Sequence, residues 1–312
     1  MEALFVAAAL GAGALLPVQA GANAQLSRAV GSPFGATALQ LGVGSGLLLL
    51  VALLTGTLAA LAGLPRVPWW HAAGGTASAF YVVSTLLLFP RLGAVVTVGL
   101  LIAGQMLASL ALDTFGLLGV AAKPATAVAL SGTLAVLAGA ALIVRGQEGV
   151  GVGAGAAARS PERPGWTALA LAAGAVLPVQ GAVNGLLRRD LGAPFAVGAV
   201  SFLVATLAMA GVLLLATALL RQPRPRLAGL HAMPWWGWLG GVAGAAYVTT
   251  VFTAIPVIGT AGAVGLTVAG QQAASVLVDR YGWFRLPRRP VSGLRLAGVA
   301  VLLAGVAALA LA

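Results

Sequence analysis

The stretch Leu16-Pro17-Val18-Gln19, followed by Asn23, decides the fold because it returns as Leu177-Pro178-Val179-Gln180, followed by Asn184. These two copies are 161 residues apart, whereas a second set of repeated residues is 166 residues apart. Those pairs are Trp69-Trp70 and Trp235-Trp236, Tyr81 and Tyr247, Pro90 and Pro256, Gly104-Gln105 and Gly270-Gln271, Ser109 and Ser275, Asp113 and Asp279, and Pro124 and Pro290. A repeat of this kind in an apolar chain is typical of membrane proteins built from two related halves.

The composition is that of a protein embedded in lipid. Hydrophobic residues make up 60% of the 312 residues and charged residues 7%, against roughly 25% charged in a soluble domain. The chain has no cysteine, which excludes disulfides and thiolate metal sites. His71 and His231 have no further ligand-forming residue at metal-binding spacing, so we predict no metal site.

The net charge is +11, which in a soluble protein would suggest a nucleic-acid partner. Here the basic residues fall in short segments between apolar runs, where such residues orient helices and meet anionic lipid head groups. We therefore expect membrane lipids, and no nucleic acid, among the partners.

Each half divides into five apolar runs long enough for the roughly 20 residues that cross a bilayer. Unbroken apolar runs of this length favour helices over barrel strands, which would alternate in polarity. The runs lie near 3–26, 34–62, 69–89, 93–113 and 124–144, and near 166–187, 195–219, 234–255, 259–279 and 291–311. The sequence thus predicts an all-α integral membrane protein with ten transmembrane helices, in modules 1–144 and 166–312 joined by a linker at 145–165.

Five spans is an odd number, so the second module must cross the membrane in the opposite direction to the first, as a 5+5 inverted-topology repeat. Thirteen Arg and Lys residues fall on the side of the linker and four on the other side. Because positive charge collects on the cytoplasmic side of a membrane protein, we expect a multi-pass protein of the cytoplasmic (inner) membrane, with the linker in the cytoplasm and both termini outside. Most of the excess comes from the second half.

Polar side chains occur where the centre of the bilayer is expected. In the first predicted helix Gln19 and Asn23 are four residues apart and share a face, and Pro17 frees the carbonyl of Gly13 from helical hydrogen bonding. Helices kinked at Pro17 and Pro178 can offer donors and acceptors to a polar solute. The predicted substrate-binding residues are therefore Gln19, Asn23, Gln180 and Asn184. The alternative is that these amides only join helices through hydrogen bonds.

A polar stripe follows the fourth and ninth predicted helices at steps of four residues. Its members are Gln105, Ser109 and Asp113 in the first half and Gln271, Ser275 and Asp279 in the second. One interpretation is a cavity wall, in which Gln105 and Gln271 contact the solute and Asp113 and Asp279 bind a proton or another coupling cation. The other is a structural ion pair, since an aspartate at a helix C-terminus opposes the macrodipole and needs a specific partner. Arg280 is adjacent to Asp279.

Tyr81 and Tyr247 lie inside the third and eighth predicted spans. They either line the solute path or pack in the core with a satisfied hydroxyl group, and we include both among the candidate substrate-binding residues.

Motifs for catalysis are missing from the sequence. There is no glycine-rich phosphate loop followed by Lys and Ser or Thr, which argues against ATP hydrolysis by this chain. There is also no Ser-His-Asp, paired-carboxylate or HExxH arrangement. We therefore predict that the protein is not an enzyme and uses no cofactor.

Two extended motifs resemble those of a known family. Pro-Val-Gln-x-x-x-Asn is followed by Gly31-Ser32-Pro33-Phe34 in the first half and by Gly192-Ala193-Pro194-Phe195 in the second, and Gly-Gln-x-x-x-Ser-x-x-x-Asp-x-x-Gly occurs at 104–116 and 270–282. Together they resemble the YdcZ-like branch of the drug/metabolite transporter superfamily, once per half. The resemblance implies a secondary transporter made of two fused five-helix modules, and in many relatives an exporter of small polar or cationic metabolites.

The chain departs from this pattern in two ways. Gln25 in the first half becomes Leu186 in the second, so the halves need not contribute equally to a site. The small multidrug members of the superfamily depend on a glutamate in the middle of their first helix, which this chain lacks. The resemblance therefore does not imply proton-coupled export of lipophilic cations by that route.

We predict a secondary transporter, acting as an exporter, that moves a small polar metabolite or drug-like solute across the membrane by alternating access. In this hypothesis one half rocks against the other, with a proton or cation as coupling ion, in a monomer or homodimer. The alternative is a non-transporting membrane scaffold or binding protein, or a passive pore.

Overall fold

The computed structural model describes residues 2–148, 163–285 and 292–310, and within these ranges the chain is helical, with no strand. The first half contains α1 (Glu2–Val30), α2 (Pro33–Leu54), α3 (Trp69–Ala72), α4 (Thr76–Phe115) and α5 (Ala127–Glu148). The second half contains α6 (Arg163–Leu191), α7 (Pro194–Ala218), α8 (Leu239–Ile258), α9 (Thr260–Tyr281) and α10 (Gly293–Ala310). Short 3-10 turns join them at Thr57–Arg66, Ala73–Gly75, Leu117–Gly119, Leu227–Ala232, Trp235–Trp238 and Trp283–Arg285.

The ends of several helices follow local signals in the sequence. Gly31 has a φ of 67° where α1 ends, which a residue without Cβ adopts at little cost. Ser32 then caps α2, because its side-chain oxygen accepts a hydrogen bond from the backbone N–H of Gly35, and Pro33 occupies the first turn. The glycine that closes the second family motif, Gly116, ends α4 in the left-handed region with a φ of 60°.

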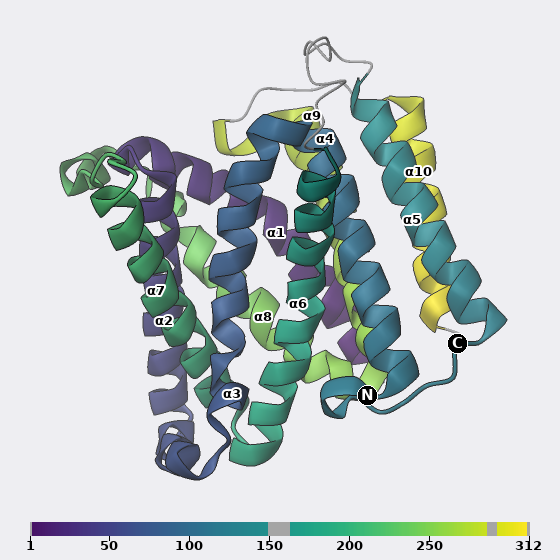
Figure 1. Ribbon diagram of the computed structural model, residues 1–312, viewed down its shortest axis with the longest axis horizontal. Coiled ribbons are helices and arrows are strands. Elements are labelled where there is room, and N and C mark those ends of the chain that lie inside the picture. The colour runs from purple at the N-terminus through teal and green to yellow at the C-terminus, as the bar shows by residue number, and fades with distance from the viewer. Residues whose placement is uncertain (1, 149–162, 286–291, 311–312) are drawn as a thin grey trace.

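Residues 76–113 of the spans predicted at 69–89 and 93–113 belong to one uninterrupted helix, α4, where a break between two helices was expected. This helix is not straight. The Ser78 side chain bonds to Gln180 of α6, and Leu101 abuts Gly174 of the same helix. At 1.5 Å per residue those two points on α6 are about 9 Å apart, whereas a straight helix would separate 78 and 101 by about 35 Å. The chain therefore turns back within α4, and Figure 1 shows its two limbs on either side of α6.

The corresponding part of the second half is divided into two helices. Gly259, with a φ of 78° and a ψ of 166°, separates α8 from α9. The two halves thus differ in how they connect equivalent segments.

The most extensive helix contacts join the two halves to each other. They are α5 with α10, α4 with α6, α2 with α7, and α1 with both α8 and α9. In Figure 1 α5 and α10 form one edge of the molecule, and α2 and α7 lie toward the opposite edge. The sequence halves are therefore interleaved in space.

Glycines allow two of these contacts to form between backbones. A Cβ added at Gly13 of α1 would overlap the carbonyl oxygen of Thr267 in α9, and one added at Gly174 of α6 would overlap that of Leu101 in α4. Since Gly13 and Gly174 are repeat equivalents, the same close helix approach occurs twice.

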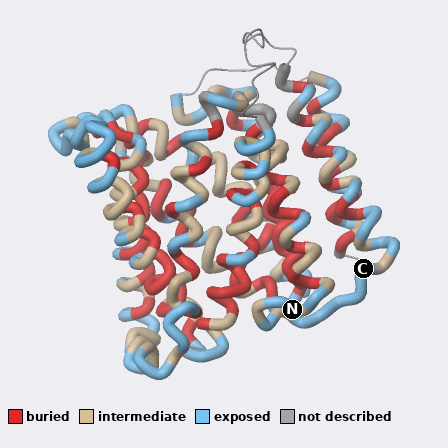
Figure 2. Tube along the Cα trace, in the orientation of Figure 1, coloured by how far each residue is buried: buried red, intermediate tan, exposed pale blue. Residues whose placement is uncertain are grey.

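The outer surface is suited to lipid. Large apolar side chains such as Leu54 and Leu214, 76% and 68% exposed, face outward, and buried residues follow the inward faces of the helices in Figure 2. Among the described residues, seven helices are long and apolar enough to cross a membrane, and two shorter apolar helices accompany them. The seven are Glu2–Val30, Pro33–Leu54, Thr97–Phe115, Pro164–Leu191, Pro194–Ala218, Trp235–Ile258 and Thr260–Tyr281, and the shorter ones are Ala127–Ile143 and Gly293–Leu309. The protein is an all-α membrane protein.

Both chain ends lie at one end of the bundle in Figure 1, whereas the end of α5 and the start of α6 lie at the other. Most of the predicted linker, residues 149–162, lies outside the described residues, and helices extend into it from both sides, to Glu148 and from Arg163.

Candidate functional site

Three amide side chains of the first half converge on one face of α8. Gln19 and Asn23 come from α1 and Gln40 comes from α2. A Cβ added at Gly244 of α8 would lie 2.8 Å from Nε2 of Gln19 and 3.4 Å from Nε2 of Gln40. At Gly240 the same atom would lie 2.8 Å from Oδ1 of Asn23. Two glycines one helical turn apart thus make room for this group, which we call the first amide cluster (Gln19, Asn23 and Gln40).

Part of the hydrogen-bonding capacity of the first amide cluster is unused among the residues that the structure describes. Oδ1 of Asn23 and Oε1 of Gln40 are buried and have no hydrogen-bond partner in the part of the chain that the structure describes. Gln40 is only 3% exposed. Buried polar atoms are paired in most proteins, so these two acceptors require an explanation.

Gln40 is not among the residues predicted from the sequence. It carries a recognisable signal, because it is the one amide side chain in the largely apolar helix α2. A search for repeated residues does not find Gln40, because the equivalent residue 161 positions later is Ser201.

The second half places its amides differently. Nε2 of Gln180 donates to the Ser78 hydroxyl over 2.9 Å, and that hydroxyl lies 3.1 Å from Oε1 of the same glutamine. Nδ2 of Asn184 donates to the Ser201 hydroxyl over 3.0 Å, whereas its Oδ1 has no partner. We call Gln180, Asn184, Ser78 and Ser201 the second amide cluster. It joins α6 to α4 and α7.

Asp113 caps a helix of the other half. Its two carboxylate oxygens accept hydrogen bonds from the backbone N–H groups of Thr260 and Ala261, over 2.7 and 2.6 Å. These groups begin α9 and have no acceptor within their own helix. A cavity of about 30 Å³ beside Asp113 is also lined by Lys123. The carboxylate thus stabilises the break between α8 and α9.

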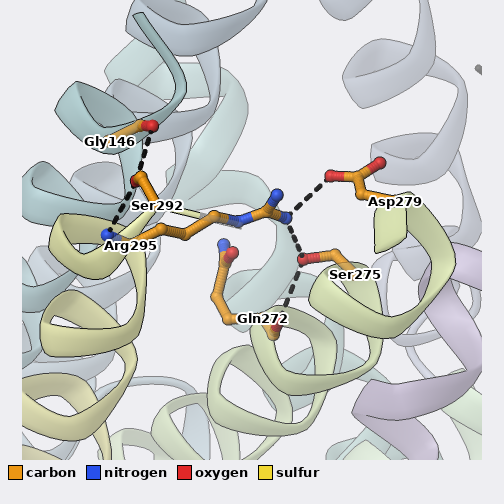
Figure 3. Close-up of polar contacts among 6 residues, drawn as sticks. All are labelled: Gly146, Gln272, Ser275, Asp279, Ser292 and Arg295. Carbon is orange, nitrogen blue, oxygen red and sulfur yellow. Dashed lines mark hydrogen bonds and ion pairs between the residues drawn. The ribbon is translucent and has the colours of Figure 1, made fainter. Parts of the chain in front are cut away.

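Asp279, the repeat equivalent of Asp113, forms an ion pair instead. Its Oδ2 lies 2.7 Å from a guanidinium nitrogen of Arg295 in α10, and the same nitrogen donates to the Ser275 hydroxyl over 3.4 Å (Figure 3). Arg295 is 2% exposed. Asp279 thus pairs with Arg295 and not with the neighbouring Arg280. Arg295 is among the basic residues predicted to lie in loops, but this residue is buried in α10.

The two polar stripes are not equivalent in their surroundings. Gln105 is buried, and its carbonyl accepts the Ser109 hydroxyl within the same helix. Gln271 is partly exposed, whereas the adjacent Gln272 is buried and lies beside Arg295 in Figure 3. Sequence reasoning did not single out Gln272.

The two repeat-equivalent tyrosines, Tyr81 in α4 and Tyr247 in α8, are both half-buried. Tyr247 also packs against the apolar core. Pro17 and Pro178 lie inside α1 and α6, which continue on both sides of them, so kinks at these positions stay a prediction.

One polar pair has no counterpart among the predicted sites. Nδ1 of His71 in α3 contacts Oδ2 of Asp190 near the end of α6. It is an interaction of two residues, and among the described residues no group of three or more His, Cys, Asp or Glu comes together to hold a metal ion.

An apolar helical bundle with amide side chains buried between its helices is the architecture of a multi-pass membrane transporter. The family model described as "Putative inner membrane exporter, YdcZ" matches residues 4–142 and 165–308, once in each half. The chain belongs to this family of inner-membrane exporters.

Nineteen chains of solved structures also match this protein. One, titled only "Crystal structure of protein", is 19% identical, has a TM-score of 0.69, and aligns over 98% of this chain and 95% of its own. It shows a shared fold. No curated protein matches.

Proposed function

We propose that the protein is a secondary transporter that exports a small polar solute by alternating access, with buried amide side chains as its solute-binding groups. The observation that carries this proposal is the presence of Asn23 and Gln40 side-chain oxygens that are buried and unpaired between α1, α2 and α8. Burying such groups without a partner costs about 1–3 kcal/mol each. A carrier gains by retaining them because a solute can complete their hydrogen bonds.

We further propose ten membrane crossings in an inverted repeat. Support comes from the seven long apolar helices, the two shorter ones, and the first limb of α4. The repeated packing of α1 on α9 and of α6 on α4 supports a two-fold relation between the halves. The proposed orientation places the linker in the cytoplasm and both termini outside, because basic residues are concentrated at the linker side.

The interleaved contacts refine how the site would open. Since the most extensive interfaces join the halves, moving one half away from the other would separate most of the helix contacts. We propose instead that paired helices from both halves tilt together. A complete site within one chain also supports a functional monomer.

Transport by purified protein in lipid vesicles tests the proposal. A panel of labelled polar metabolites is measured with and without a pH gradient, and we expect saturable flux for at least one solute. Asn23→Ala should abolish that flux while the protein still purifies as a folded species. A non-saturable flux would indicate the passive pore, and no flux by folded protein would indicate the scaffold. A folding defect alone in Asn23→Ala would mean that the amide only joins helices.

A further inference from the structure

The two amide clusters occupy equivalent positions of the repeat, and two exchanges of residue distinguish them. Ser78 in the second cluster corresponds to Gly244 beside the first, and Ser201 corresponds to Gln40. Each serine supplies a hydroxyl that bonds an amide of α6. At the first amide cluster one hydroxyl is replaced by a glycine and the other by a third amide. Among the described residues this cluster keeps two acceptors open, whereas the second cluster keeps one, Oδ1 of Asn184.

We propose that the first amide cluster alone binds the transported solute, and that a hydroxyl or amino group of the solute takes the place that the Ser78 hydroxyl takes in the second cluster. This inference rests on the proposed function. The second cluster then serves as a permanent clamp between α6, α4 and α7, and the transporter has one asymmetric site.

The geometry around Gly244 supports this assignment. A Cβ at this position would lie 2.8 Å from Nε2 of Gln19, which is shorter than van der Waals contact, so the glycine lets this amide lie against the α8 backbone. In the second cluster the side chain of Ser78 comes from the equivalent position and bonds Gln180 on both sides of its amide. The first amide cluster therefore has the glutamine of this arrangement, Gln19, but lacks the hydroxyl group that would bond to it.

The unpaired atoms indicate the chemistry of the solute. Both are amide oxygens, which accept hydrogen bonds and donate none, so the solute must present O–H or N–H donors. Asp113, Asp190 and Asp279 have partners elsewhere, and thus none of these carboxylates is free to balance a full positive charge here. The site is suited to a small hydroxylated or amino solute recognised by its donors.

The absence of cysteine from the sequence allows a direct test. Gly244→Cys and its matched control Ser78→Cys are each treated in membranes with 2-hydroxyethyl methanethiosulfonate. Gly244 is buried and Ser78 is half-buried, so the readout is the protection of each thiol by a solute and not the bare reaction rate. Ethylene glycol should slow the reaction at 244 and not at 78, whereas 1,2-dimethoxyethane, which has no O–H donor, should slow neither.

Two further variants test the difference between Ser78 in the second cluster and Gly244 beside the first. Gly244→Ser supplies a hydroxyl in place of the solute and should lose transport while its melting temperature rises above that of Gly244→Ala, which adds only the methyl group. Ser78→Gly should melt lower than the parent protein. Equal protection at 244 and 78, protection by 1,2-dimethoxyethane, no protection by ethylene glycol at 244, or full transport by Gly244→Ser would overturn the inference. If the parent protein transports no solute although ethylene glycol protects position 244 and not position 78, the proposed function fails and the asymmetry of the two clusters stands.

Discussion

Gln40 and Ser201 stand at equivalent positions of the two halves, and this single exchange changes the hydrogen bonding around each. Ser201 is short and receives a hydrogen bond from Asn184, whereas Gln40 reaches the face of α8 and leaves its oxygen unpaired. Gln25, which departs from the repeat at Leu186, has a structural role, because its amide donates to the Phe284 carbonyl over 2.8 Å and holds the turn after α9. Gln40 and Gln25 both depart from the repeat, but Gln40 leaves an acceptor unpaired among the described residues, whereas Gln25 holds a turn.

The ion pair between Asp279 and Arg295 leads to a prediction at this scale. Asp279→Asn leaves the guanidinium, 2% exposed, without its counter-charge. Removing one partner of a buried pair costs 3–5 kcal/mol, and we expect about 3 kcal/mol because Asp279 is 21% exposed. Thermal unfolding in detergent measures the loss. The double variant Asp279→Leu with Arg295→Met should recover most of it, and a single variant as stable as the parent would show that the pair contributes nothing.

At the scale of the element, Asp113 begins a helix that belongs to the other half of the chain. Asp113→Ala removes the acceptor for two N–H groups of α9 and should lower stability by about 1–2 kcal/mol, the usual cost of losing a helix cap. Asp113→Asn, which retains one acceptor, should lose less. These values come from denaturation in detergent.

The same variants separate the two interpretations of the polar stripe. If Asp113 binds a coupling proton, Asp113→Asn makes transport by the protein that remains folded insensitive to a pH gradient. If it only caps α9, the gradient acts as before on whatever protein remains folded.

The crossing of α1 and α9 gives a matched pair of substitutions on one helix. Gly13→Ala would place a methyl group against the Thr267 carbonyl, whereas Gly11→Ala meets no atom within 4 Å. We expect Gly13→Ala to reduce the yield of folded protein strongly. Gly11→Ala should be neutral or more stable by up to about 1 kcal/mol, the difference in helix propensity. Similar yields for both variants would mean that the helices separate easily at this crossing.

At the scale of the whole molecule, each half depends on the other for its helix contacts. The pairs α5 with α10, α4 with α6, and α2 with α7 all cross between halves. Residues 1–148 or 163–312 expressed alone should therefore aggregate or be degraded, while the two fragments expressed together should copurify through an affinity tag on one of them. A stable, monodisperse single fragment would contradict this prediction.

The proposed orientation predicts the behaviour of fused reporters. Alkaline phosphatase, which is active only outside the cytoplasm, should be active when attached after residue 312, and green fluorescent protein should fluoresce when inserted in the linker. The reverse pattern would place the termini in the cytoplasm.

The sequence by itself determined the membrane-embedded all-helical class, because the unbroken apolar runs leave backbone groups no partners except within a helix. It also determined the family, because the repeated motifs are local: Gly31 and Gly116 end helices, and Gln19 and Asn23 share a face wherever α1 packs. Only the tertiary structure decided which residue each polar side chain bonds to. The repeat alone predicts equal roles for Asp113 and Asp279 and for the two pairs of amides, yet each side chain bonds to whatever residue lies across the interface. Those residues, such as Gly244 opposite Gln19 and Ser78 opposite Gln180, come from distant segments that sequence spacing does not bring together.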